Sequence, residues 1–210
     1  MDAQHFRDSM VTAILPHATF DGWSKAAMAA AARDLELEPT MPARLFPGGP
    51  IELVAHFVEM ADRAMAAALA TEGLSSTKVG ERIFQAVRLR LEPWGEHREA
   101  IRRAASLLSL PTNLPLAARL TWNTADSIWR AVGDQSHDFA WYTKRATLSA
   151  VYSSTLLYWL DDASEDSAET WAFLRRRLND VRNLPKLRER VEAWVAGVKA
   201  PARRWGMPPR

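Results

Sequence analysis

A proline–glycine break followed by a long helical pattern occupies residues 47–70, which read PGGPIELVAHFVEMADRAMAAALA. Pro50 suits the first position of a helix, where its missing amide hydrogen costs no hydrogen bond. Apolar residues then recur at spacings of three and four, at Leu53, Val54, Phe57, Met60, Ala61 and Ala64. This is the period of one helical face, so the break ends one region of the chain and an amphipathic helix begins the next.

The same helical period continues on both sides of this stretch, and no segment shows the convincing alternation of a strand. Upstream, we expect helices from Ala3 to Leu15, where Pro16 should end the first, from Lys25 to Arg33, and from Thr40 to Phe46. Downstream, the expected helices cover residues 76–91, 94–108, 114–132, 139–161, 168–181 and 184–199.

This pattern predicts an all-α bundle of about nine or ten helices. The breaks divide it into an N-terminal module at residues 1–48, a helical body at 49–182 and a terminal segment at 183–210. The terminal segment would hold an amphipathic helix followed by a basic tail.

The composition excludes several chemistries. The chain has no cysteine, which removes disulfides, thiol catalysis and cysteine-based zinc sites. Its five histidines are scattered without a ligand-like pair, and no nucleophile–base pair or cofactor motif accompanies them. No uncharged run reaches the roughly 20 apolar residues of a membrane-spanning helix. We therefore expect a protein that is not an enzyme, binds no metal and does not cross a membrane.

The N-terminal helices resemble the layout of TetR-type transcriptional regulators. The resemblance lies in Phe20-x-Gly22-Trp23-Ser24, in the alanine-rich helix that follows and in Leu45-Phe46. Duplex DNA is bound largely through basic side chains that neutralise phosphates. Residues 1–60 hold eight acidic and four basic residues, and the expected recognition helix offers only Arg44 as a cation. We expect a remnant helix-turn-helix that does not bind nucleic acid, and a ligand-responsive regulator is the alternative.

An unusual segment at residues 133–145 reads GDQSHDFAWYTKR and is followed by SAETWAFLRRRL at 167–178. It resembles the signature of the ubiquinone-biosynthesis accessory proteins, called coenzyme-Q protein nine in eukaryotes, and the chain is identified as a bacterial member. The resemblance is most specific over residues 111–182. It implies a TetR-like homodimer that binds an isoprenoid lipid or quinone precursor in a hydrophobic cavity and uses no other cofactor. It also implies a cytoplasmic protein, peripheral on the inner membrane, that presents the precursor to a ubiquinone-pathway hydroxylase.

The same resemblance implies a surface that binds the hydroxylase. Carried over by position, this surface comprises Asn123, Ile128, Asp138, Trp141, Tyr142 and Arg145. On the residues alone, Trp141 and Tyr142 suit either a binding hot spot or a buried core. In the second case Arg145 would pair with Asp134 or Asp138.

The lipid site itself has no motif, because a prenyl cavity needs little more than apolar walls. Helical faces suggest Phe57, Met60, Phe84, Leu120 and Leu148 as its walls. A solid core is equally compatible with these residues.

The end of the chain is strongly basic, because residues 171–210 hold eleven basic and three acidic residues. One face of the helix expected there carries Leu187, Val191, Trp194, Val195 and Val198. An apolar face with a tryptophan beside basic residues is typical of a helix that lies on a membrane. Amphipathicity alone also fits a helix packed on the body, and the resemblance favours the membrane.

Overall fold

The computed structural model describes residues 3–73, 77–136 and 139–182, which are helical nearly throughout. No strand occurs in these ranges, so the all-α prediction is confirmed. Eight α-helices have both ends within them, and residues 168–182 add a further helical stretch. The eight are slightly fewer than the nine or ten helices that the helical periodicity predicts.

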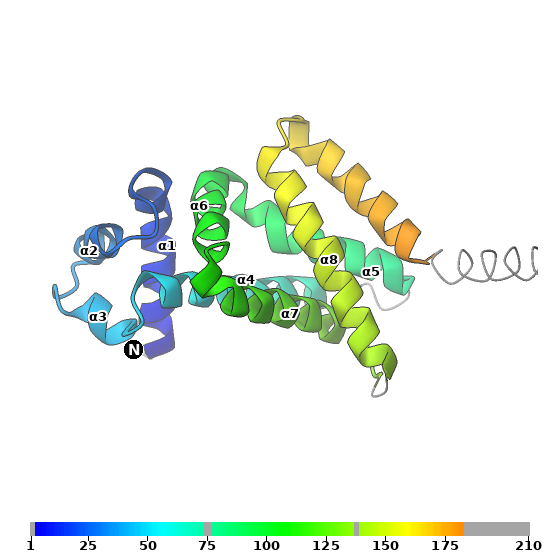
Figure 1. Cartoon of the computed structure of the whole chain (residues 1–210), viewed down its shortest axis with the longest axis horizontal. Coiled ribbons are helices and arrows are strands. Elements are labelled where there is room, and N and C mark those ends of the chain that lie inside the picture. The colour runs from blue at the N-terminus through cyan, green and yellow to red at the C-terminus, as the bar shows by residue number, and fades with distance from the viewer. Residues whose placement is uncertain (1–2, 74–76, 137–138, 183–210) are drawn as a thin grey trace, which may run out of the picture.

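Helices α1 (Ala3–Asp21), α2 (Lys25–Asp34) and α3 (Met41–Leu45) gather at one end of the molecule (Figure 1). Helix α1 packs against α2 and also against α4 and α6 of the body. Ser24 caps the start of α2, because its hydroxyl accepts a hydrogen bond from the Ala27 amide at 3.1 Å.

Helix α1 continues through Pro16, so the prediction that this proline ends the helix is wrong. A proline inside a helix leaves the carbonyl four residues earlier without its helical donor. Here Ile14 and Ala18, on either side of the proline, are fully buried, and their packing stabilises the helix across it. The helix ends before Gly22, whose φ of +67° is left-handed backbone that glycine adopts at little steric cost.

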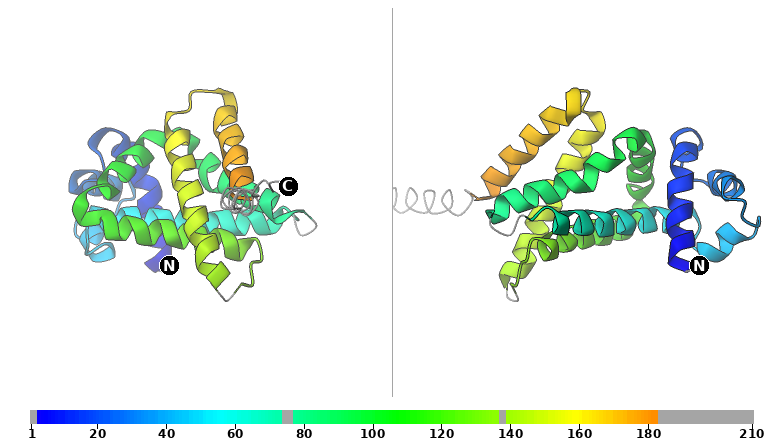
Figure 2. Two further views of the ribbon diagram at one scale, coloured as in Figure 1. Left: turned by 45° about the vertical axis from the view of Figure 1, so that its right-hand side comes forward. Right: turned by 180° about the vertical axis from the view of Figure 1, so that it is seen from behind.

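The body contains α4 (Pro50–Thr71), α5 (Val79–Leu91), α6 (Arg98–Leu108), α7 (Leu114–Ala131) and α8 (Phe139–Asp161). The expected helix 94–108 opens as a 3-10 helix, η2 (Glu92–His97). Helix α4 packs against α5 and α7, and α7 packs against α8. The views of Figure 2 show the stretch 168–182 running beside α8 after a tight connection.

A buried polar cluster joins three helices of the body. Asp62 of α4 accepts a hydrogen bond from Arg90 of α5 at 2.6 Å, and its two carboxylate oxygens accept from the Thr124 hydroxyl of α7 at 3.1 and 2.9 Å. All three side chains are buried, and a buried charge is tolerated only when it is paired and hydrogen-bonded. The cluster therefore specifies how α4, α5 and α7 meet.

Asp162 organises the connection between α8 and the stretch 168–182. Its carboxylate accepts hydrogen bonds from the amide and hydroxyl of Ser164, at 2.8 and 2.6 Å, and from those of Thr170, at 2.8 and 2.5 Å. Arg98 of α6 donates to the Asp162 carbonyl and to the Ser167 hydroxyl. These bonds set the direction in which the chain leaves α8 and returns over α5.

Candidate functional site

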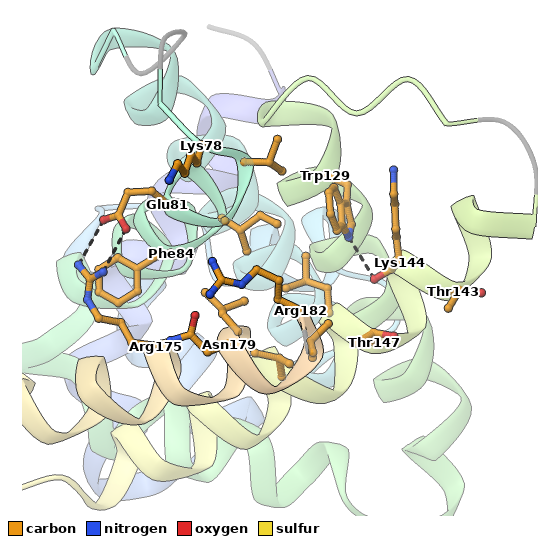
Figure 3. A pocket seen from close by; sticks show the side chains of 17 residues that line it. Lys78, Glu81, Phe84, Trp129, Thr143, Lys144, Thr147, Arg175, Asn179 and Arg182 are labelled. Carbon is orange, nitrogen blue, oxygen red and sulfur yellow. Dashed lines mark hydrogen bonds and ion pairs between the residues drawn. The ribbon is translucent and has the colours of Figure 1, made fainter. Parts of the chain in front are cut away.

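An apolar pocket lies between α5, α7, α8 and the stretch 168–182 (Figure 3). Its volume is about 540 Å³, within the range of pockets that take small molecules. The inner wall is formed by Ile83, Phe84, Leu148, Val151, Leu178 and Val181. Such a surface offers a ligand hydrophobic contact and few hydrogen bonds.

Charged side chains lie around this pocket, and most of them already have partners. Arg175 donates two hydrogen bonds to Glu81, at 3.0 and 3.2 Å, while its guanidinium lies 3.9 Å from the ring centre of Phe84. Lys144 donates to Asp134 at 2.7 Å.

Lys78 and Arg182 are different, because neither forms an ion pair with any residue of the described ranges. Figure 3 shows them approaching the pocket from two sides, Lys78 just ahead of α5 and Arg182 from the stretch 168–182. The pocket thus has apolar walls, paired charges beside them and two cations that lack a carboxylate partner among the described residues.

A second feature lies where α7 meets the first turns of α8. Arg145 is only 2% exposed, and its guanidinium donates to Asp126 at 2.5 Å and to Asp134 at 3.1 Å. The same guanidinium lies 4.0 Å from the ring centre of Trp141. Arg145 is therefore a buried cation that joins two carboxylates to an aromatic ring.

Asp134 is held in its charged form. The burial of its side chain raises its pKa, but hydrogen bonds from Lys144, Ser136 and Arg145 lower the pKa more, to well below the ordinary range of a carboxyl group. Since Asp134 follows α7 while Lys144 and Arg145 belong to α8, the ionised carboxylate holds the two helices together.

Aromatic side chains cover this charged cluster. The Trp141 ring centre lies 5.7 Å from that of Trp122 and 4.8 Å from that of Tyr142. Tyr142 is 61% exposed and Phe139 is 83% exposed. Aromatic residues exposed to this degree on a rigid support are typical of protein-binding surfaces.

Of the residues that the sequence predicts for a partner surface, Trp141 contacts both Tyr142 and Arg145, whereas Asn123 lines a hollow between α7 and α4. Asn123 and Tyr142 are exposed and Trp141 is partly exposed, whereas Ile128 and Arg145 are buried beneath the surface. These two residues can affect a partner only through the side chains above them. Asp138 lies outside the described residues.

The predicted lipid-site residues separate into two groups. Phe84 and Leu148 line the pocket. The others lie outside its lining: Phe57 packs on the rings of Trp23 and Trp94, Leu120 is buried, and Met60 packs partly buried against the core.

The charged residues Lys78, Arg175 and Arg182 were missed by sequence reasoning. They come from distant parts of the chain, and no local pattern marks them as neighbours. The predicted membrane face, Leu187, Val191, Trp194, Val195 and Val198, lies outside the described residues.

Neither a metal cluster nor a spanning segment is found in the part of the chain that the structure describes. No group of three or more histidine, cysteine, aspartate or glutamate side chains there could hold a metal ion. No helix there is both long and apolar enough to cross a lipid bilayer.

The fold is that of TetR-type regulators. The chain superimposes on the crystal structure of a TetR transcriptional regulator from Nitrosomonas europaea with a TM-score of 0.67, covering 83% of this chain and 96% of that one. The two sequences are 21% identical, so the likeness shows the fold alone.

Sequence comparison then identifies the family. The COQ9 family model matches residues 114–185. The mitochondrial ubiquinone biosynthesis protein COQ9 of Homo sapiens is 33% identical over 95% of this chain and 66% of its own length. The corresponding figures are 32%, 95% and 67% for COQ9 of Rattus norvegicus, and 31%, 95% and 71% for COQ9-B of Xenopus laevis.

The chain belongs to the COQ9 family, which confirms the resemblance seen in residues 133–145. It spans about two thirds of the length of these relatives.

Proposed function

We propose that this chain is a non-catalytic accessory protein of ubiquinone biosynthesis. It binds an isoprenoid lipid or quinone precursor and presents it to a ring hydroxylase. The observation that carries this proposal is the apolar pocket in a member of a family whose relatives are named ubiquinone biosynthesis proteins.

The pocket suits a prenyl chain on physical grounds. An isoprenoid chain has no hydrogen-bonding groups, so it gains affinity from buried apolar area, about 25 cal/mol per Å². Phe84 and Leu148 supply such area from α5 and α8, and Leu178 supplies it from the stretch 168–182. A pocket of about 540 Å³ holds part of a long prenyl chain and leaves the rest outside.

The aromatic surface of α7 and α8 is the proposed contact for the hydroxylase. Tyr142 and Trp141 offer large side chains that a partner can cover. Arg145 lies beneath them and is best described as a positioning residue, because its bonds to Asp126 and Asp134 fix the backbone that carries both rings. Hot-spot aromatics lose little entropy on binding when they are already held in place.

We also propose that the chain forms a homodimer and works at the cytoplasmic face of the inner membrane. The support for a membrane contact is compositional, since residues 171–210 combine a strong positive charge with apolar positions at helical spacing.

The direct test is native mass spectrometry with solvent extraction of the full chain, purified from cells that make ubiquinone. We expect an isoprenoid quinone or precursor at close to one molecule per chain. Leu178→Trp, which fills the pocket, should lose this ligand. Leu157→Trp is the matched control, because Leu157 is 60% exposed on α8 and outside the pocket lining. Repeated lipid-free preparations of well-folded protein contradict the proposal.

A further inference from the structure

We infer that the ligand of this pocket carries an anionic head group, which binds between Lys78 and Arg182 while its apolar chain lies against the inner wall. This inference rests on the proposed lipid-binding function and specifies the chemistry of the head group.

The charges fall into two kinds. Glu81 is the one acidic residue among the described residues that line the pocket, and Arg175 neutralises it with two hydrogen bonds. Lys144 is neutralised by Asp134. The remaining charges, Lys78 and Arg182, have no carboxylate partner in the described ranges, so the described lining of the pocket has an excess of positive charge.

The two cations beside the pocket repel each other. An anion that binds between them attracts both, and this attraction offsets the repulsion. A guanidinium presents a planar pair of donors that matches a carboxylate or a phosphate, while an ammonium acts as a point charge with three donors. Hydrogen bonds between charged groups are about twice as strong as neutral ones. Lys78 and Arg182 together therefore suit a single carboxylate or phosphate group.

The apolar wall makes the ligand an amphiphile rather than a free anion. Each cation is followed or preceded by an apolar residue of the same pocket, Val79 after Lys78 and Val181 before Arg182. A chain lying on Ile83 and Phe84 can thus place its head group at the cations without crossing polar surface. A ligand with a neutral head leaves both cations unpaired. An acidic aromatic ring with a prenyl chain, a fatty acid and a lipid phosphate all satisfy them.

The test is equilibrium dialysis of the delipidated full chain against three probes with the same chain length: hexadecanoate, hexadecyl phosphate and hexadecanol. Inorganic phosphate is the fourth probe, and all lipids are kept below their micelle concentrations. We expect both anionic lipids to bind at least about tenfold more tightly than the alcohol, and inorganic phosphate to bind far more weakly. The preferred anion distinguishes a carboxylate ligand from a phosphate ligand.

A double variant that combines Lys78→Gln and Arg182→Gln tests the two cations at the pocket. The matched control is the double variant that combines Lys25→Gln and Arg176→Gln. Lys25 and Arg176 are exposed and do not line the pocket, so the control loses the same charge elsewhere. The pocket variant should bring the anionic lipids to within about threefold of the alcohol, whose own affinity stays unchanged. The control should keep the full preference.

The outcomes separate the two proposals. Equal binding of alcohol and anions by the native chain overturns the head-group inference and leaves lipid binding standing. Binding of inorganic phosphate as tight as that of hexadecyl phosphate also overturns it, because the site would then recognise a free anion. Binding of none of the lipids overturns the lipid-binding function itself.

Discussion

The aromatic surface of α7 and α8 and the apolar pocket differ in which side chains are buried and which are exposed. At the surface, the charged side chains of Arg145 and Asp134 are buried, the Trp141 ring packs on the Arg145 guanidinium, and the neighbouring Tyr142 ring is exposed. At the pocket, apolar side chains are buried and charges are exposed, with Phe84 and Leu148 beneath cations. Lys144 belongs to both, since it lines the pocket and also binds Asp134.

The difference indicates two kinds of recognition. Charges that are buried and fully paired hold a backbone in one position, which suits a surface that a folded protein must fit. Apolar walls next to charges suit a flexible amphiphile. Its chain binds in the apolar pocket, and its head group binds to the charged side chains. One helix, α8, serves both regions, so a ligand and a partner protein can meet along it.

The largest expected effect comes from removing the buried cation. Arg145→Ala removes the cation that Asp126 and Asp134 share. We expect a loss of about 3–5 kcal/mol in the free energy of unfolding, measured by urea denaturation. Arg130→Ala is the control, because Arg130 also pairs with Asp126 but is mostly exposed, and it should cost less than about 1 kcal/mol. Equal effects of the two changes contradict a structural role for the buried network.

The aromatic surface is tested by Tyr142→Ala. The side chain is mostly exposed, so folding should be nearly unchanged, while partner binding should weaken by about 2 kcal/mol, the loss typical of a binding hot spot. In cells that depend on this chain, ubiquinone should fall and a precursor awaiting hydroxylation should accumulate. The quinone profile by mass spectrometry measures both. Leu157→Ala is the exposed control on the same helix. An unchanged quinone profile in the Tyr142 variant contradicts the proposal that the aromatic surface binds the hydroxylase.

Two hydrogen-bonded carboxylates, Asp134 at the aromatic surface and Asp162 after α8, predict a dependence of stability on pH. The pKa values of Asp134 and Asp162 are lower in the folded protein than in the unfolded chain, because the folded protein donates hydrogen bonds to both carboxylates. Stability from these groups is therefore complete above the unfolded pKa of about 4, and it is lost as the pH falls below that value.

Urea midpoints at a series of pH values between about 7 and 2 measure this loss. The variant Asp134→Asn should be less stable at neutral pH and should lose less stability on acidification. If the variant loses as much stability on acidification as the native chain does, Asp134 does not contribute to the pH dependence of stability.

The smallest expected effect concerns the paired charges at the pocket. Glu81→Gln frees Arg175 from an exposed ion pair, so stability should change by less than about 1 kcal/mol. The pocket gains positive charge, and the affinity for hexadecanoate should rise about two- to fivefold while that for hexadecanol stays constant. If the affinity for both probes falls instead, the electrostatic expectation is wrong and Glu81 supports the structure of the pocket wall.

Sequence alone predicted the helices better than it predicted how they meet. The bounds of α8, Phe139–Asp161, are those expected from the sequence, because a helical segment of this length is easily distinguished from a strand. Pro16 was misread because a local rule for proline was overridden by the burial of Ile14 and Ala18.

The sites were predictable only where a motif exists. Segment 133–145 was found through the family resemblance. The pairing of Arg145 with Asp134 was one of the alternatives that the sequence left open, and the structure contains it. The bond from Arg145 to Asp126, by contrast, joins two helices that no local pattern pairs. Among the proposed lipid-site residues, Phe84 and Leu148 reach the pocket while Phe57 packs into the core. The spacing of apolar residues shows which face of a helix is covered by the rest of the protein. It does not show whether the neighbouring helix packs against that face or leaves a cavity there.

The central claim, that a prenyl-type chain binds inside the pocket, is tested most directly by photo-crosslinking. A hexadecanoate with a diazirine near the end of its chain is bound to the delipidated full chain, irradiated and located by peptide mass spectrometry. The account predicts labelling of α5 at Ile83 or Phe84 and of α8 at Leu148 or Val151, and loss of that labelling in Leu178→Trp. Labelling confined to the aromatic surface around Trp141 and Tyr142 would contradict it.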